Sequence, residues 1–213
     1  MYTKERIEAR NAFAEKVAPY ARKYQIGARG KKTGPDWRAI DLYDKSELID
    51  DRWDLQSLPL PNESVDCFLC NAVLEHVPNP ALAIYEMYRT LRHGGQIWVE
   101  VPFMQFYHAH PNDFTRWTLP GIRMAMQDFV DVRSGIATSF DYEAGKIFEF
   151  LHRDIGELPD ASEKQDLVAY VQDKLATVRN PRVYGSVYFW GEKSAASLAP
   201  EMIQYFEYLK TRL

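Results

Sequence analysis

The middle of the chain shows two hydrophobic patterns in succession. Residues 65–70 are apolar almost throughout, as expected for a strand covered on both faces. Asn79 and Pro80 then match a helix N-cap and a first helical position, and apolar residues recur at helical spacing as far as Gly94. Another apolar run occupies residues 96–101. The pattern predicts a strand–helix–strand unit of about 37 residues, the size of a right-handed βαβ motif.

The rest of the chain repeats this alternation of short apolar runs and longer amphipathic segments. We expect further helices at 3–22, 119–129, 144–178 and 200–213, and strands at 23–26, 37–42, 47–50, 130–137 and 182–193. Strands that alternate with helices predict one α/β domain over residues 1–213, with a mostly parallel sheet. This domain would contain an N-terminal helix (1–22), a helical insertion (140–180) and a C-terminal helix (198–213).

Composition narrows the class of protein. The chain has 213 residues, of which 46% are hydrophobic and 26% charged, as is typical of soluble globular proteins. The net charge of −4 argues against a general nucleic-acid binder, which needs clustered Lys and Arg. No apolar run approaches the ~20 residues of a membrane span, and the charged N-terminus lacks a signal core. We therefore expect a cytoplasmic protein that binds neither nucleic acid nor membrane.

The two cysteines, Cys67 and Cys70, have the spacing of a redox C-x-x-C motif. They lie within a predicted buried strand, where positions three apart point to opposite faces of the sheet. This placement favours two separate buried thiols over a redox pair.

A denser signal comes from residues 53–102, which read WDLQSLPLPNESVDCFLCNAVLEHVPNPALAIYEMYRTLRHGGQIWVEVP. An aspartate stands four residues before an LP pair, LEHV follows the apolar strand, and a leucine precedes GG. This stretch strongly resembles class I S-adenosylmethionine-dependent methyltransferases of the type 11-like branch. The resemblance implies a Rossmann-like, mostly parallel seven-stranded sheet flanked by helices, with S-adenosyl-L-methionine as cofactor.

The resemblance also implies which residues surround the cofactor. Asp41 matches the acidic residue that accepts hydrogen bonds from the ribose hydroxyls, a task that suits the two acceptor oxygens of a carboxylate. Asp54 matches the aspartate that contacts the adenine amino group, and Leu55 would flank the adenine ring. Asn71 would border the methionine portion. The alternative for Asp41 is a surface or capping role.

The loop HAHPNDFTRWT follows the strand that ends in VEVP, so it should lie beside the cofactor's methyl group. Its candidates for proton transfer are His108, His110 and Asp113. Candidates for substrate binding are Tyr107 and Trp117, which could stack on a sugar face, and Arg116, which could hold a phosphate or carboxylate. The alternative is a packed aromatic loop whose histidines only cap backbone groups.

His76 in LEHV could approach the substrate, or it could pack beneath the loop before the helix. Glu75 and His76 alone are too few ligands to argue for a metal. The H-x-H pair of the later loop lacks a clear third ligand, so we expect no metal site.

The first nucleotide-binding turn departs from the family pattern. Gln25 stands where an acid is usual, and Gly27 and Gly30 keep part of the glycine turn. The segment KKTGPDW then has no apolar face and contains a helix-breaking proline, so the first crossover helix is predicted to be reduced or missing. The N-terminal helix, the final helix or a second subunit would then have to cover the exposed sheet face. The last of these possibilities predicts a homodimer.

Three functions are compatible with these residues. The first is a methyltransferase that acts on a small-molecule, sugar-like or nucleotide-linked acceptor, since the histidine loop resembles a subgroup often encoded near polysaccharide-forming enzymes. The second is a catalytically inactive methyltransferase-like binding or scaffold protein. The third is a binder of another nucleotide, whose phosphate would lie on Lys31 and Lys32.

Overall fold

The computed structural model describes residues 2–28, 30–140, 144–145, 166, 169–170, 173, 184–195 and 200–211. The expected insertion at 140–180 therefore lies almost entirely outside the described residues and stays a prediction. Within the described part of the chain, no helix is long and apolar enough to cross a membrane.

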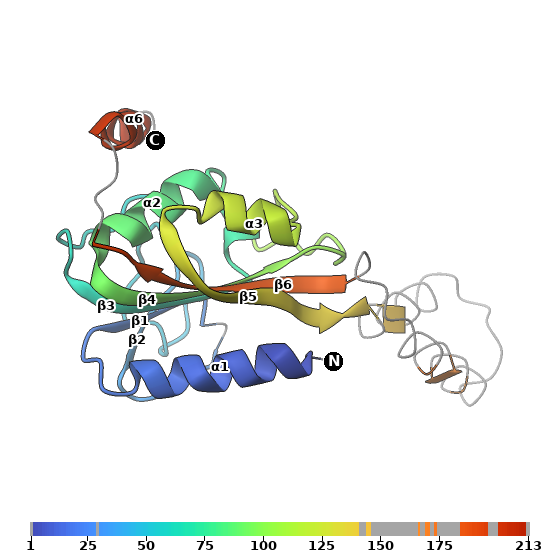
Figure 1. Ribbon diagram of the computed structural model, residues 1–213. Helices are drawn as coiled ribbons and strands as arrows, with labels where there is room; N and C mark the ends of the chain where they lie inside the picture. The colour runs from blue at the N-terminus through green and yellow to red at the C-terminus, as the bar shows by residue number, and fades with distance from the viewer. Residues whose placement is uncertain are drawn as a thin grey trace.

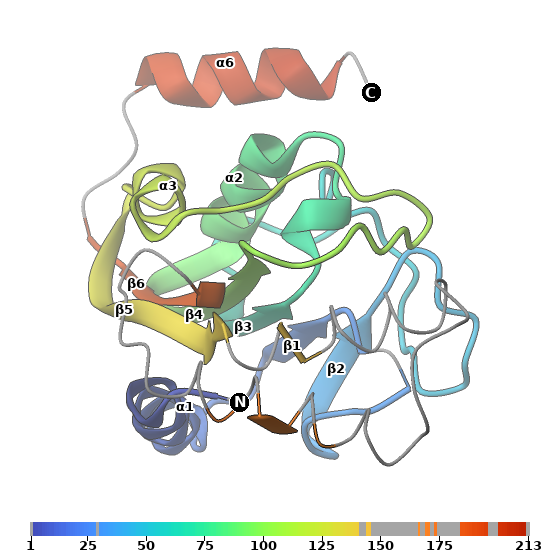
Figure 2. The same cartoon turned by 90° about the vertical axis from the view of Figure 1, so that its right-hand side faces the viewer.

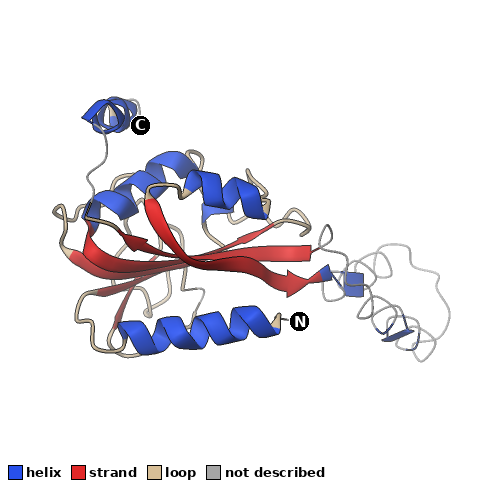
Figure 3. Cartoon of the chain, in the orientation of Figure 1, coloured by secondary structure: helices blue, strands red, loops and turns tan. Residues whose placement is uncertain are grey.

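A mixed six-stranded sheet forms the centre of the molecule (Figure 3). In the order β2-β1-β3-β4-β6-β5, its strands are β2 (Trp37–Ile40), β1 (Lys23–Ile26), β3 (Val65–Asn71), β4 (Leu91–Pro102), β6 (Tyr184–Lys193) and β5 (Phe129–Ser139). The first four strands are mutually parallel, and β6 pairs antiparallel with both β4 and β5. The expected Rossmann-like, mostly parallel architecture is confirmed.

The seventh strand that the family resemblance implies is missing among the described residues. Its predicted place, residues 47–50, forms no strand, and only an isolated bridge joins Ile40 to Asp51. The Asp50 carboxylate accepts a hydrogen bond of 2.6 Å from the backbone N–H of Ala39. Because this side chain occupies a donor that a neighbouring strand would use, the edge of the sheet ends at β2.

The central βαβ unit forms as predicted, with a different boundary. Asn79 caps helix α2 (Pro80–Thr90) by accepting a hydrogen bond from the N–H of Leu82. The helix ends at Thr90, four residues before Gly94, because Leu91 already has extended backbone angles and begins β4. The prediction that the helix continues to Gly94 was therefore wrong, and Gly94, with a positive φ of 70°, lies inside the β4 segment.

No helix connects β1 to β2 in the described residues between them, which confirms that the first crossover helix is missing. The side chain of Gln25 holds the short connection instead. It donates to the carbonyl of Lys31 at 2.9 Å and accepts from the N–H of Thr33 at 2.7 Å. The residue that replaces the usual acid therefore shapes the loop that replaces the usual helix.

Helix α1 (Lys4–Val17) covers one face of the sheet, and α2 and α3 (Leu119–Ala125) cover the other (Figure 1). The buried side of α1 consists of Ala9, Phe13 and Val17, which pack with Trp98 and its neighbours. Ile7 is 45% exposed, and the predicted helix extension to residue 22 does not form. The N-terminal helix thus packs on this face mainly next to β5 and β6.

The final helix, α6 (Pro200–Lys210), packs on α2 rather than on the sheet, with Phe206 stacked on Tyr85 (Figure 1). The expectation that it could cover the open sheet face is therefore not met. Helix α3 is shorter than predicted, since the chain leaves the helix after Ala125 and enters β5 at Phe129.

The two cysteines lie in β3 as free, buried residues. Cys67 packs in the cluster beneath α1, and Cys70 packs in the cluster on the α2 side. Burial raises the pKa of both thiols, so neither has the character of a reactive thiolate. The prediction of opposite faces is confirmed.

Candidate functional site

The strand order reverses at β1. The chain first continues from β1 to β2 on one side of it, and then crosses to β3 on the other side. Ligands of open α/β sheets bind at the carboxyl ends of the strands at this switch point. A pocket with about 730 Å³ of empty space, partly open to solvent, lies at this place. Its lining includes Gly27, Asp41, Asp54, Leu55, His76 and His110. Six residues that the sequence singled out therefore meet in one pocket.

Asp41 follows directly after β2 at the pocket wall. Its Oδ1 accepts hydrogen bonds from the backbone N–H groups of Tyr43 and Asp44, at 2.9 and 3.0 Å. These two bonds fix the turn after the strand and orient the carboxylate. Oδ2 makes neither of these bonds, so a capping role and a ligand-binding role are compatible in this residue.

Asp54 and Leu55 stand side by side at another part of the pocket wall. Oδ1 of Asp54 accepts from the N–H of Gln56 at 2.8 Å, and the Gln56 side chain also lies within hydrogen-bond distance of both carboxylate oxygens. Gln56 in turn accepts from the N–H of Asn79, the cap of α2. The start of α2 thereby fixes the position of the Asp54 carboxylate.

Gly27 closes the pocket floor at the end of β1, with a positive φ of 73°. A Cβ at this position would lie 2.3 Å from Cγ2 of Val73, which also lines the pocket. Gly30 also has a positive φ, of 74°, but it does not line the pocket and has open space around it. Glycine is therefore required by sterics at Gly27 and by backbone conformation alone at Gly30.

Asn71 is the last residue of β3 and does not line the pocket. Its side-chain oxygen is buried and has no hydrogen-bond partner among the described residues. The residue that follows it, Ala72, does line the pocket and has a φ of 50°, which L-residues adopt at a cost. The proposed contact of Asn71 with the methionine portion stays a prediction.

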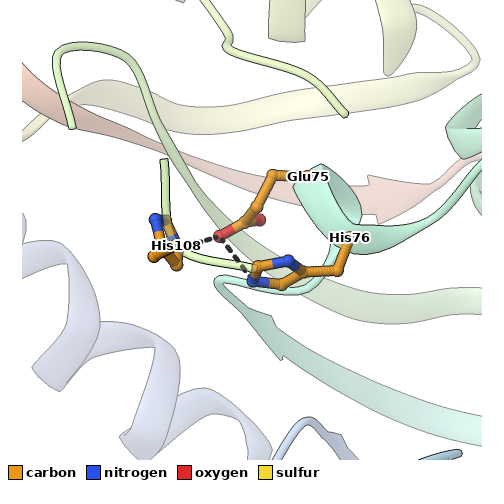
Figure 4. Close-up of side chains that lie close together, drawn as sticks. All are labelled: Glu75, His76 and His108. Atoms are coloured by element: carbon orange, nitrogen blue, oxygen red, sulfur yellow. Dashed lines mark ion pairs between the residues drawn. The ribbon is translucent and has the colours of Figure 1, made fainter. Parts of the chain in front are cut away.

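A second cluster lies next to this pocket, where the short 3₁₀ helix η1 (Leu74–His76) meets the loop after β4. The two imidazoles of His76 and His108 approach one carboxylate, that of Glu75 (Figure 4). Nε2 of His76 lies 3.7 Å and Nε2 of His108 lies 3.6 Å from Oε1 of Glu75. Glu75 is fully buried, while both histidines are partly accessible.

Comparisons with known proteins agree with this architecture. Residues 41–99 match the family model of a methyltransferase domain. The resemblance of this central part of the chain to class I S-adenosylmethionine-dependent methyltransferases is confirmed. A curated relative, an uncharacterised 37.1 kDa protein in transposon TN4556 of Streptomyces fradiae, is 30% identical over 91 residues, which are 36% of this chain and 26% of the relative. The chain thus matches only about a quarter of that relative's length.

Solved structures share the fold of this methyltransferase domain. The [4+2]-cyclase SpnF has a TM-score of 0.56 and 16% identity, over 89% of this chain and 81% of its own. A possible histamine N-methyltransferase from Thermotoga maritima has a TM-score of 0.55 and 16% identity, over 89% and 88%. A putative sarcosine dimethylglycine methyltransferase from Galdieria sulphuraria has a TM-score of 0.53 and 11% identity, over 91% of this chain and 92% of its own. At these identities the likeness shows the fold alone.

The histidine loop of the methyltransferase domain runs from β4 over this edge of the sheet to α3 (Figure 2). Asp113 lies at its centre, paired with Arg116 and bonded to the N–H of His108 at 2.9 Å. The Arg116 guanidinium holds the pKa of Asp113 down to about 2, although partial burial opposes this shift. The ion pair and the hydrogen bond show that Asp113 orients His108 and Arg116, and its part in proton transfer stays a prediction.

Arg116 also donates to the carbonyls of Gln105 and Phe106, at 3.2 and 2.7 Å. Its donors thus bind the loop itself, and its role toward a substrate anion stays a prediction. Tyr107 is 70% exposed and lies outside the pocket lining, whereas Trp117 is partly buried against the core. His110 lines the pocket, and His108 belongs to the Glu75 cluster.

The sequence did not predict the cluster of Glu75, His76 and His108. The signals present in the sequence were the adjacent acid and imidazole of LEHV and an H-x-H pair that begins more than thirty residues later. Only the loop between β4 and α3 brings these segments together, so spacing along the chain could not join them.

Proposed function

We propose that this methyltransferase domain transfers the methyl group of S-adenosylmethionine to a hydroxyl of a small, sugar-like or nucleotide-linked acceptor. One observation carries the proposal: the carboxylates expected for the nucleoside, Asp41 and Asp54, line a single pocket at the switch point of the sheet together with His76 and His110. The family assignment supports the cofactor, and the acceptor class rests on the resemblance of the histidine loop.

The pocket lining gives the cofactor an orientation. In this proposal the ribose hydroxyls bind Asp41, while adenine lies along Leu55 with its amino group toward Asp54. The methionine end then lies at Gly27, the pocket residue without a side chain. The sulfonium methyl group would face His76 and His110, which line the rest of the pocket.

The reaction is an in-line displacement. A lone pair of the acceptor oxygen forms the new C–O bond, the C–S bond breaks, and its electron pair stays on sulfur to give S-adenosylhomocysteine. The hydroxyl proton passes to a nearby imidazole, for which His110 and His108 are the candidates. Alignment of nucleophile, methyl group and sulfur is the main contribution that a rigid pocket supplies.

Calorimetry with S-adenosylhomocysteine tests the proposal. We expect micromolar binding to the unmodified chain and a tenfold to hundredfold weaker affinity for Asp41→Ala, on the order of one or two charge-assisted hydrogen bonds. Asp44→Ala is the matched control, because it keeps the N–H that bonds Asp41 and removes a carboxylate outside the pocket lining.

Three results would separate the functions considered. Binding that is lost in Asp41→Ala and kept in Asp44→Ala supports the methyltransferase. No heat at millimolar ligand, from a folded sample, would favour the inactive scaffold. Preference for a phosphorylated nucleotide would favour the third function, although Lys32 already forms an ion pair of 2.6 Å with Asp50.

A further inference from the structure

Four carboxylates are buried in the described part of the chain: Asp66, Glu75, Glu86 and Glu100. Three of them face arginine or lysine side chains. Asp66 pairs with Arg22 and Arg92, Glu86 with Arg89 and Lys210, and Glu100 with Arg6. Glu75 is the exception, and both of its oxygens are buried with no hydrogen-bond partner among the described residues.

Two imidazole nitrogens face the Glu75 carboxylate, and hydrogen bonds fix the tautomer of each imidazole. Nδ1 of His76 lies 2.6 Å from the carbonyl oxygen of Asn112, and Nδ1 of His108 lies 2.8 Å from that of Phe106. Because a carbonyl only accepts, each Nδ1 carries the proton and donates it. In the neutral tautomers, both Nε2 lone pairs then face the carboxylate, and the three groups together lack a positive charge.

We propose that Glu75, His76 and His108 bind one divalent transition-metal ion. Their ligand atoms all lie within 4.8 Å of one another. Bonds of 2.0–2.2 Å in tetrahedral geometry place ligand atoms roughly 3.3–3.6 Å apart. The observed separations from Oε1 of Glu75, 3.6 and 3.7 Å, match this spacing closely.

A proton is the competing occupant, because an imidazolium at His108 would also neutralise Glu75. Charge-assisted N–H···O bonds are about 2.7–2.9 Å long. Both separations from Glu75 are longer than that by about 0.7 Å or more. The spacing therefore fits an ion between the ligands better than a proton shared by two of them.

The donor set indicates the class of metal. Two imidazoles and one carboxylate suit Zn²⁺, Co²⁺, Mn²⁺ or Fe²⁺, whereas Mg²⁺ and Ca²⁺ prefer oxygen ligands throughout. The backbone carbonyls on the Nδ1 atoms are the outer-sphere partners that orient histidine ligands in metal sites.

The ion would also sit beside the reaction, and this role rests on the proposed function. His76 belongs both to the cluster and to the pocket lining. With three protein ligands, a metal keeps positions for an acceptor oxygen and lowers the pKa of a hydroxyl bound there. The cluster thereby points to an acceptor that binds through oxygen.

Metal titration without any nucleoside tests the site. Chelator-treated, tag-free protein is titrated with ZnSO₄ in the calorimeter, and with CoCl₂ while visible absorption is recorded. We expect one equivalent bound with micromolar or tighter affinity. In Glu75→Gln and in His108→Asn the affinity should fall on the order of a hundredfold, since changes to outer-sphere partners alone cost 10–100-fold.

His110→Asn is the matched control, because it removes a histidine two residues from His108 and outside the cluster. Its metal affinity should equal that of the unmodified chain. Circular dichroism of each variant separates a lost ligand from a lost fold. The site is refuted if Zn²⁺ and Co²⁺ do not bind stoichiometrically, or if Glu75→Gln, correctly folded, binds them equally well.

The two proposals fail independently. Nucleoside binding without metal binding leaves the methyltransferase proposal intact and removes the metal. Metal binding without nucleoside binding keeps the ion site and refutes the methyltransferase.

Discussion

The two halves of the site differ in how their carboxylates are bonded. On the nucleoside side, the carboxylates of Asp41 and Asp54 accept hydrogen bonds from backbone N–H groups two or three residues further along the chain. On the acceptor side, Glu75 is fully buried and accepts none from the described residues. The first pair is oriented before any ligand arrives, whereas Glu75 faces two histidines from different segments. A carboxylate that backbone hydrogen bonds already orient indicates a preformed part of a binding site. A buried carboxylate without hydrogen bonds indicates a place where a ligand or ion would bind.

The largest expected effect concerns the floor of the nucleoside side. Gly27→Ala combines a positive φ with a clash against Val73, so the free energy of unfolding should fall by about 2–4 kcal/mol. Gly30→Ala has the same backbone conformation without the clash, and should lose only about 1–2 kcal/mol. Urea unfolding measures both values. Equal losses would show that Val73 does not pack against Gly27.

The next effect belongs to the acceptor side. Zn²⁺ at a hundred times its dissociation constant should stabilise the chain by about 2.7 kcal/mol, or roughly 5–10 °C in melting temperature at this length. Glu75→Gln should show almost none of this shift, whereas Asp41→Ala should keep all of it. A thermal-shift assay reads both variants on one plate. A zinc shift that persists in Glu75→Gln would place the ion elsewhere.

A third test asks whether Asp54 recognises the adenine amino group. S-inosylhomocysteine carries a carbonyl oxygen where S-adenosylhomocysteine has the amino group. The unmodified chain should prefer the adenosine compound by about tenfold, near 1.4 kcal/mol, and Asp54→Ala should lose this preference. Competition calorimetry with both ligands measures the ratio. If the preference survives in Asp54→Ala, adenine is recognised by other groups.

The smallest effect concerns Asp66, a paired carboxylate near the start of the same strand that leads to Glu75. Burial by itself raises the pKa of Asp66, but hydrogen bonds from Arg22 and Arg92 outweigh burial and hold the pKa well below its usual range. Because solvent screens the half-exposed Arg22, the contribution of this pairing to stability is at most about 1 kcal/mol; it is complete above about pH 5 and declines as the pH falls toward the lower folded pKa.

The pH dependence can be isolated by comparison with Asp66→Asn. The unmodified chain should exceed this variant in stability at pH 7, and the difference should shrink below about pH 5. Glu47→Gln, at an exposed position, serves as the control. A difference that grows as the pH falls would mean that the pKa of Asp66 is raised in the folded state, which would contradict the assignment.

Sequence patterns predicted the parts of the fold that are locally encoded. The strand β3, the Asn79 cap and the loss of the first crossover helix all depend on residues adjacent in the chain. The helix end near Gly94 and the strand at 47–50 were wrong, because β-sheet pairing and the Asp50 side chain decided these boundaries. Both depend on contacts between segments, which a periodic pattern does not contain.

The candidate site shows the same division. The positions of Gly27, Asp41 and Asp54 were predictable because each stands directly after a strand or in a short motif. The cluster of Glu75 with His108 was not predictable, since it forms only when the loop after β4 folds back over η1. Residues that stand next to each other along the chain could be read from the sequence, and residues that meet only in the fold could not.

One crystal structure, of the chain with S-adenosylhomocysteine and Zn²⁺, tests most directly whether both halves serve one reaction. We expect the ribose hydroxyls on Asp41 and an anomalous zinc peak between Glu75, His76 and His108. The ligand sulfur should lie within roughly 7 Å of that peak, the sum of a near-attack distance, a C–S bond and a metal–oxygen bond. Ligand bound elsewhere, or with its sulfur pointing away from the cluster, would contradict the account.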